Sequence, residues 1–418
     1  MQERAENLAA VGFHPVRHAF ELGTIAIALL ALASCGGGDV ATDPPADADD
    51  GFKIGLILVG PKEDAGWSQA HFNGVEYVIE NMPDASFDFA DRVNPADQPN
   101  LQASQVADDL IDSGADMIIF NSDDHKDDAL ATAESHPDVA VIHASGDSAW
   151  EEGQNFQDLP NLSNVMVQME FGRAIAGCAA ALETQDGKIG FLGPLINDET
   201  RRLVSAAYLG ADYCWQVYRE GDPAELDFKV SWIGFWFNIP GVTLDPTQVA
   251  DSFFNDGYDV VMTGIDTPEA ATQAAKAAEA GNDVKFLHYT LPTGCDLAPD
   301  ICIGVPTYNW GPSYLEAAQA AAAGEFEGSF VWAEPDWEDM NNPDTSAVGF
   351  VQGEALSEEN TALLSEFIEK LGDGSIDLYE GPLNYQDGSE FVAAGQTATP
   401  EQIWYMPQLL EGIDGASE

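Results

Sequence analysis

Short apolar runs alternate with amphipathic stretches along most of the chain. Residues 54–59 form a continuous apolar run that ends before a Gly-Pro pair, a pattern that predicts a parallel strand buried on both faces. In the next segment, residues 71–80, apolar residues recur at helical spacing. Strands and helices that alternate in this way predict right-handed crossovers and doubly wound parallel sheets.

The alternation continues to about residue 288. The further strands that we expect are residues 87–89, 117–120, 139–142, 189–192, 229–233, 260–262 and 284–288. The further helices that we expect are residues 101–111, 127–134, 171–182, 199–218, 249–254 and 268–280.

The chain beyond residue 51 is longer than one hydrophobic core usually organises, so we expect two lobes. Residues 159–164 are rich in Pro and Asn and form the expected boundary. We assign residues 52–165 and 303–335 to the first lobe, and residues 166–302 and 336–418 to the second.

The N-terminal segment predicts export. The apolar run over residues 22–32 is shorter than the stretch of about 20 residues that spans a bilayer, so residues 1–34 are expected to be a signal peptide. The small residues before Cys35 resemble a lipobox, which predicts a lipid on that cysteine; a buried helical cysteine is the alternative. Residues 35–51 are rich in Gly, Pro and Asp and predict a disordered tether to the membrane.

The composition is strongly acidic but compatible with a folded core. Asp and Glu number 72 against 15 Lys and Arg, for a formal charge of −57, while 45% of the residues are hydrophobic. Such a surface stays solvated at high salt, which suggests a halophilic or marine source, and it disfavours nucleic acid as a partner. Among so many carboxylates, the acidic run 123–128 is better explained as a solvated loop than as a metal site.

Sequence signatures of catalysis are missing. The chain has no nucleophile elbow, no phosphate-binding Walker loop, no zinc-protease motif and no dinucleotide fingerprint after its first strand. We therefore expect no catalytic residue, no metal and no cofactor.

Four cysteines follow Cys35, and they allow three pairings in an oxidising compartment. We prefer a bridge between Cys295 and Cys302, which would close a short loop. Cys178 lies in an apolar helical stretch, where a cysteine can simply belong to the core.

Aromatic residues follow the strands. The first strand leads into Asp64, Trp67 and Ser68, and ligands of open α/β sheets bind beyond the carboxyl ends of the strands. Trp236 follows a later strand in the same way, and two flat rings across a cleft would stack on a planar ligand, at about 1–3 kcal/mol per ring. Packing between the lobes is the alternative for the tryptophans, and for Asp64 it is a helix N-terminal aspartate.

From residue 53 to about residue 412 the chain resembles the basic membrane protein family of ABC-transporter substrate-binding lipoproteins, relatives of the purine nucleoside receptors. The residues that carry the resemblance are Gly60-Pro61, Asp64, Gly66-Trp67-Ser68, His71, Gly74, His136-Pro137-Asp138-Val139, Gly172-Arg173, Ala176-Gly177, Lys188-Ile189-Gly190-Phe191, Glu199, Arg202, Leu209-Gly210-Ala211, Trp236-Phe237, Asp266-Thr267-Pro268, Asn309-Trp310-Gly311-Pro312, Tyr314, Gly381-Pro382-Leu383 and Gln386-Asp387-Gly388.

The resemblance implies a periplasmic-binding-protein type I fold, in which two α/β lobes, each a doubly wound parallel sheet flanked by helices, close on a ligand across a hinge that the chain crosses three times. It implies a purine held between two rings, with Trp67 and Trp236 in or near the stacking positions. The resemblance also makes Asp64 and Asp266 polar readers of the ligand, and Ser122 and Trp310 wall residues.

The chain differs from the family's nucleoside receptors in the segment that binds the ribose. Nucleoside receptors of this family carry an Asp-Lys pair after the strand at residues 284–288, where the lysine reaches the ribose, but this chain has Tyr289-Thr290-Leu291-Pro292. A free base such as adenine is thus at least as well supported as a nucleoside.

These observations favour a monomeric, lipid-anchored receptor that captures a purine and delivers it to an ABC permease of the membrane, without catalysis. Two alternatives stay open. The cleft could hold a sugar, riboflavin or another planar metabolite, or serve a signalling partner. An extracellular nucleosidase could use Asp64, Asp266 and Glu199 as acid and base.

Overall fold

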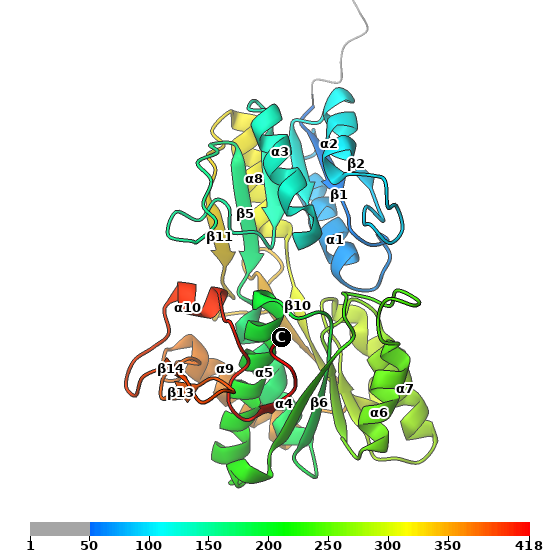
Figure 1. The fold of residues 1–418 in the computed structure, drawn as a ribbon, viewed down its shortest axis with the longest axis vertical. Helices are drawn as coiled ribbons and strands as arrows, with labels where there is room; N and C mark the ends of the chain where they lie inside the picture. The colour runs from blue at the N-terminus through cyan, green and yellow to red at the C-terminus, as the bar shows by residue number, and fades with distance from the viewer. Residues whose placement is uncertain (1–50) are drawn as a thin grey trace, which may run out of the picture. The chain divides into compact units, whose positions relative to one another are not determined.

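A computed structural model describes residues 51–418 of the chain (Figure 1). The predicted signal peptide, the lipid attachment at Cys35 and all but the last residue of the tether lie outside the described residues, and they stay predictions. Within residues 51–418, no helix combines the length and the apolar character that crossing a membrane requires.

The first lobe is built on a six-stranded sheet in which every pair of neighbours is parallel. In spatial order its strands are β11 (Phe330–Ala333), β5 (Leu162–Val167), β4 (Ala140–Ala144), β3 (Met117–Phe120), β1 (Lys53–Ile57) and β2 (Ser86–Ala90). Its helices are α1 (Trp67–Asn81), α2 (Ala103–Asp112), α3 (Lys126–Ser135) and α8 (Gly311–Ala323).

Both faces of this sheet are covered by helices. Leu56 of β1 belongs to the core that includes residues of α1 and α8, and its neighbour Ile57 belongs to the core that includes residues of α2 and α3. Successive side chains of a strand point to opposite faces, so a strand buried on both sides must be apolar throughout.

The second lobe is built on a seven-stranded sheet. Its order is β12 (Val348–Gln352), β10 (Cys302–Tyr308), β9 (Lys285–Leu287), β8 (Val260–Thr263), β6 (Lys188–Gly193), β7 (Asp227–Trp232) and β15 (Ile413–Asp414). All neighbours are parallel except the edge strand β12, which runs antiparallel to β10. The accompanying elements are α4 (Met169–Glu183), α5 (Asp198–Val217), α6 (Pro246–Asn255), α7 (Glu269–Glu279), α9 (Glu358–Gly372), the hairpin β13 (Leu383–Asn384) and β14 (Glu390–Val392), and α10 (Pro400–Trp404).

The chain passes between the two sheets three times: after β5, after β10 and after β11. The predicted two-lobed α/β fold with parallel sheets is confirmed. Strand β5 occupies the segment in which the sequence predicts the lobe boundary, so the first passage comes after residue 167. Strand β10 lies in the second sheet, although residues 303–335 were predicted to belong to the first lobe. The apolar residues of β10 are compatible with either sheet. Its pairing with β9 and β12 places it in the second sheet.

Helices α4 and α5 pack with their backbones in contact. A Cβ atom placed on Gly177 of α4 would lie 1.9 Å from the carbonyl oxygen of Ala207, and one placed on Gly210 of α5 would lie 1.9 Å from that of Ala174. No real Cβ can approach so closely, so this contact requires glycine at both positions.

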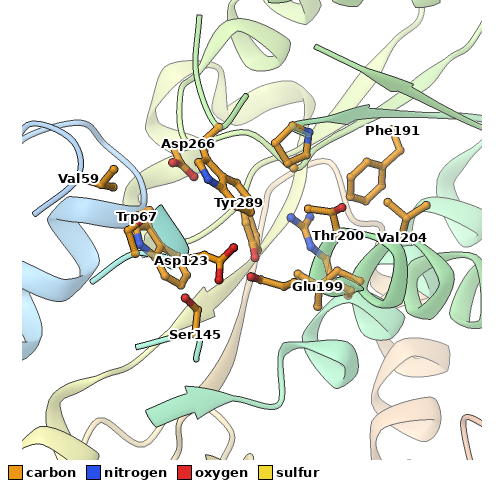
Figure 2. A pocket seen from close by; sticks show the side chains of 16 residues that line it. Val59, Trp67, Asp123, Ser145, Phe191, Glu199, Thr200, Val204, Asp266 and Tyr289 are labelled. Atoms are coloured by element: carbon orange, nitrogen blue, oxygen red, sulfur yellow. The ribbon is translucent and has the colours of Figure 1, made fainter. Parts of the chain in front are cut away.

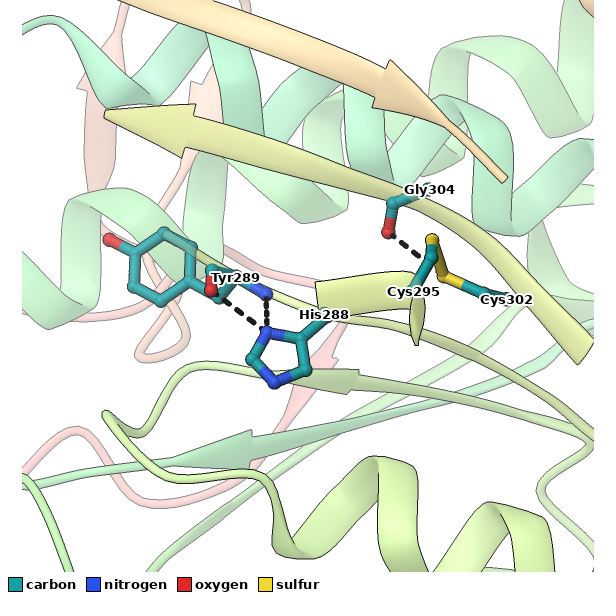
Figure 3. The surroundings of a disulfide bond; sticks show 5 residues. All are labelled: His288, Tyr289, Cys295, Cys302 and Gly304. Atoms are coloured by element: carbon teal, nitrogen blue, oxygen red, sulfur yellow. Dashed lines mark hydrogen bonds between the residues drawn. A yellow bond between two sulfur atoms is a disulfide. The ribbon is translucent and has the colours of Figure 1, made fainter. Parts of the chain in front are cut away.

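Two disulfides crosslink segments of the second lobe. Because α4 and α5 pack closely, Cys178 and Cys214 form a disulfide. Cys178 is therefore both buried and disulfide-bonded, and the interpretation of it as a simple core cysteine is wrong. A second disulfide joins Cys295 and Cys302 and closes the short turn before β10 (Figure 3).

The two disulfides offer an internal comparison of stability. The Cys178–Cys214 bond spans 36 residues and the Cys295–Cys302 bond spans 7. A crosslink removes more entropy from the unfolded chain when it closes a longer loop, so we expect a C178A/C214A variant to lose about 4 kcal/mol in free energy of unfolding and a C295A/C302A variant about 2 kcal/mol. Urea unfolding at fixed salt measures both. An equal loss in the two variants would contradict this prediction.

Candidate ligand-binding site

A cavity lies between the lobes and is partly open to solvent (Figure 2). The first lobe lines it with Val59, Trp67, Ser122, Asp123 and Ser145. The second lobe lines it with Arg173, Phe191, Pro194, Glu199, Thr200, Leu203, Val204, Trp236, Gly264, Asp266 and Tyr289.

The parallel sheets explain why these residues meet. Val59, Ser122 and Ser145 follow the carboxyl ends of β1, β3 and β4, and most of the second-lobe residues follow β6, β7, β8 and β9 or begin α5. The carboxyl ends of parallel strands share one edge of their sheet, where open α/β proteins bind ligands. Here two such edges contribute to one cavity.

Trp67 is positioned by the turn that precedes it. The Asp64 carboxylate accepts hydrogen bonds from the backbone N–H groups of Gly66, Ser68 and Gln69, at 2.8, 2.9 and 3.0 Å, and so begins α1 at Trp67. The indole Nε1 of Trp67 then donates to the carbonyl oxygen of Asn121 at 2.5 Å. Asp64 thus satisfies a helix start and does not line the cavity.

Behind Trp67 lies a stack of aromatic rings. Trp310 packs edge-to-face on Trp67 with ring centroids 5.3 Å apart, and it stacks on His71 at 4.1 Å and on Tyr308 at 5.3 Å. Only 1% of Trp310 is exposed, and it does not line the cavity, contrary to the expectation that it forms a wall. Ser68 is also buried outside the lining, where its hydroxyl accepts from the Gly60 N–H at 2.9 Å.

Trp236 belongs to the loop after β7, on the opposite lobe. Its backbone carbonyl accepts a hydrogen bond from the Asp266 N–H at 2.9 Å, which ties this loop to the end of β8. Trp67 and Trp236 therefore line one cavity from different lobes.

The lobes touch at the rim of the cavity. A Cβ atom placed on Gly66 in the first lobe would lie 2.2 Å from the carbonyl oxygen of Asp266 in the second. Only glycine allows the two backbones to come this close, so the structure shows the lobes in a closed arrangement.

A buried arginine forms part of the cavity floor. The Arg173 guanidinium carbon lies 3.4 Å from the ring centroid of Tyr289, and Nη1 donates to the Thr263 carbonyl oxygen at 2.7 Å. Burial lowers the pKa of Arg173, whereas the Tyr289 and Tyr308 hydroxyls nearby oppose that shift. The Tyr289 hydroxyl is engaged with that of Tyr308 at 2.5 Å.

Three carboxyl groups line the cavity. Burial raises the pKa of Asp266 well above its usual range, and nearby carboxylates, Asp64 first among them, raise it further. Burial raises the pKa of Glu199 to about 7, although the Arg202 guanidinium opposes this shift. Burial also raises the pKa of Asp123. Burial therefore disfavours the charged form of all three acids, and a ligand that donates hydrogen bonds to them would compensate for the lost hydration.

Of the seven ligand residues named from the sequence, the lining contains Trp67, Ser122, Trp236 and Asp266. The other three support the site from behind. Asp123, Ser145, Arg173 and Tyr289 also line the cavity, although none of them was among the ligand residues predicted from the sequence. Arg173 could have been predicted, because it is a lone arginine in the apolar stretch of α4. No feature of the neighbouring sequence distinguishes Ser145 as a cavity residue.

Within residues 51–418, no three or more His, Cys, Asp or Glu side chains are arranged to hold a metal ion. The five described histidines do not line the cavity. The site therefore offers aromatic faces, carboxyl groups and hydroxyl groups to a ligand.

This fold and cavity define a two-lobed binding protein of the periplasmic type I class. Among solved structures, an ABC transporter solute-binding protein from Aeropyrum pernix K1 matches with a TM-score of 0.62 at 12% identity, covering 80% of this chain and 93% of that one.

The family follows from the sequence profile of the PnrA-like ABC transporter substrate-binding proteins (Bmp), which matches residues 52–334; the chain belongs to this family. A purine-binding protein of Brucella abortus is 25% identical over 376 residues, which cover 88% of this chain and 95% of that protein. A putative ABC transporter glucose-binding protein of Haloferax volcanii is 25% identical over 297 residues, which cover 71% and 68%. The protein is thus an extracytoplasmic, non-enzymatic binding protein that delivers a solute to an ABC transporter.

The raised pKa of Glu199 predicts a pH-dependent stability. The folded protein holds this proton up to about pH 7, while an unfolded glutamate releases it near pH 4.3, so the cost of the buried charge is absent below about pH 4 and complete above about pH 7. We expect Glu199→Gln to match the native protein in stability at about pH 4 and to exceed it by roughly 1–3 kcal/mol at about pH 8.

Urea unfolding at constant salt measures this difference at each pH. The exposed Glu279 at the end of α7 provides the control, because Glu279→Gln should show no such trend with pH. A constant difference between Glu199→Gln and the native protein would contradict the prediction.

Proposed function

We propose that this protein binds a purine nucleobase or nucleoside and hands it to the permease of an ABC importer. The observation that carries the proposal is the pair of indoles, Trp67 and Trp236, that line one cavity from opposite lobes. A purine presents two flat faces to such a pair and N–H and amino groups to the carboxyls of Asp266 and its neighbours. The family and the purine-binding relative support this ligand class.

Lobe closure follows from the same geometry. Only a closed cleft brings both indoles within reach of one ligand, so the ligand binds the closed form more tightly and shifts the population toward it. A permease can then distinguish the loaded receptor from the empty one. We further propose that a lipid on Cys35 holds the receptor at the cell membrane.

A sugar is the second candidate, because one relative is described as a putative glucose-binding protein. Indole faces also pack on sugar rings, and carboxyls accept bonds from their hydroxyls. Titration with adenine, adenosine and glucose separates the candidates. Binding of glucose alone would refute the purine proposal.

The two indoles should contribute comparable parts of the affinity. We expect Trp67→Ala and Trp236→Ala each to weaken adenine binding by roughly 1–3 kcal/mol, measured by isothermal titration calorimetry, because each removes one stacking face. Trp337→Ala is the matched control, since Trp337 packs on Phe171 away from the cavity. Unchanged affinity in both cavity variants would count against stacking.

The close approach at the rim gives a test of closure. A methyl group at residue 66 would collide with the Asp266 carbonyl oxygen only when the lobes are closed. We expect Gly66→Ala to bind adenine at least about tenfold more weakly while its unliganded thermal stability falls little, because the clash acts on the closed form. Small-angle scattering should show that adenine compacts the native protein more than the variant. Equal affinity and equal compaction would show that closure does not need this contact.

A further inference from the structure

The loop between β7 and α6, residues 234–244, differs from the rest of the chain in charge and exposure; we call it the Trp236 loop. No Asp, Glu, Lys or Arg lies between Lys229 and Asp245, although the chain has 72 Asp and Glu. Val242 and Leu244 are 76% and 59% exposed, the highest values among the large apolar side chains of residues 51–418. Single exposed apolar side chains are ordinary, but two in one uncharged loop indicate a contact surface.

Hydrogen bonds fix the shape of the Trp236 loop. The Leu244 N–H donates to the Ile233 carbonyl oxygen at 2.9 Å and closes the base of the loop. Farther along the loop, the N–H groups of Val242 and Thr243 both donate to the Ile239 carbonyl oxygen at 3.0 Å. The Ile239 N–H donates to the Thr243 hydroxyl at 2.9 Å. The apolar side chains are therefore presented by an ordered backbone, and a partner that covers them has little chain to order.

The same loop reaches the solute cavity. Trp236 lines this cavity, and its carbonyl oxygen accepts from the Asp266 N–H at 2.9 Å. The carbonyl oxygen of Asp266 in turn faces Gly66, at the rim where the two lobes meet. A bound solute and the closure of the lobes thus both act on the loop that exposes Val242 and Leu244.

Three occupants of this apolar surface can be compared: a second copy of the chain, a membrane and the permease. Two copies that each carry a formal charge of −57 repel each other, and the same charge disfavours an anionic membrane surface. A permease that receives the solute has to contact the receptor beside the cavity, which is where the Trp236 loop lies. An uncharged loop also spares the two proteins the desolvation of carboxylates.

We propose that the receptor docks on the permease of its ABC importer through the Trp236 loop, with Val242 and Leu244 buried in an apolar, uncharged recess of the permease. This inference rests on the proposed hand-over to a permease, and not on the identity of the solute. Because one loop lines the cavity and contacts the permease, the permease can respond to the state of the cavity.

Photocrosslinking tests the contact in membranes of the cells that produce this protein. We expect a photoreactive phenylalanine analogue at residue 242 to crosslink to a membrane-spanning ABC permease, identified by the sequences of its crosslinked peptides. The same analogue at residue 217 is the control and should give no such product. Val217 is 49% exposed and ends α5, about 27 Å along this helix from Glu199 at the cavity.

Substitutions at residue 242 separate docking from solute binding. We expect Val242→Asp to reduce uptake of adenine by these cells at least about tenfold and to leave the adenine affinity within about twofold, because it removes a buried aliphatic contact and adds a charge to desolvate. Val242→Lys should fail equally, and Val242→Ile should retain uptake, since the contact is apolar. Val217→Asp is the matched control and should change neither quantity.

The inference is overturned if Val242→Asp or Val242→Lys supports native uptake, or if residue 242 crosslinks only to lipid or to a second copy of the chain. Flotation with phosphatidylcholine vesicles that Val242→Asp abolishes, without a crosslink to a permease, would assign the loop to the membrane instead. If the native protein binds no purine, the proposed ligand fails, and the crosslink from residue 242 alone decides the inference.

Discussion

The binding cavity depends on two parallel sheets that direct their carboxyl edges toward the same space. Each strand of such a sheet ends at a loop that is free to carry polar or aromatic side chains, while the strand interior must stay apolar because helices cover both faces. The three passages of the chain between the sheets hold these edges near each other. Loops that are far apart in the sequence, such as those at Trp67 and Trp236, therefore line one cavity.

The side chains behind the cavity restrict the lining residues to one arrangement. Asp64 begins α1, the Asn121 carbonyl accepts from the indole of Trp67, and the stacked ring of Trp310 supports that indole from behind. Such preorganisation reduces the conformational entropy that a ligand must remove on binding. Asp64 and Trp310 belong to the motifs that carry the family resemblance but do not line the cavity, so they can affect a bound ligand only through Trp67.

Acidic character has different consequences at the surface and in the cavity. A formal charge of −57 spread over an exposed surface keeps the protein solvated. Inside the cavity, the same residue types lose their hydration, and burial raises the pKa values of Asp123, Glu199 and Asp266. A ligand with several hydrogen-bond donors replaces the lost water, so the carboxyls that weaken the empty protein favour the loaded one.

Much of the fold is encoded locally and could be predicted. Strands such as 117–120 and helices such as α5 follow from apolar spacing. Trp67 follows from its position after a strand, and Asp266 follows from the family resemblance. Strand β5 was missed because its polar residues, Ser163 and Asn164, hide its burial. The residues next to the strand ends thus indicate that a binding site exists, but they do not indicate which side chains line it.

The remaining features of the fold and the site depend on contacts between residues that are far apart in the sequence. The burial of Trp310, the bond between Cys178 and Cys214, and the meeting of Ser145 with Glu199 each join residues whose separation in the chain carries no signal. Spacing along a strand or helix is fixed by its backbone geometry, so a single sequence reveals it. Which side chains meet across two lobes depends on sheet order and on the packing of loops, and those are properties of the assembled fold.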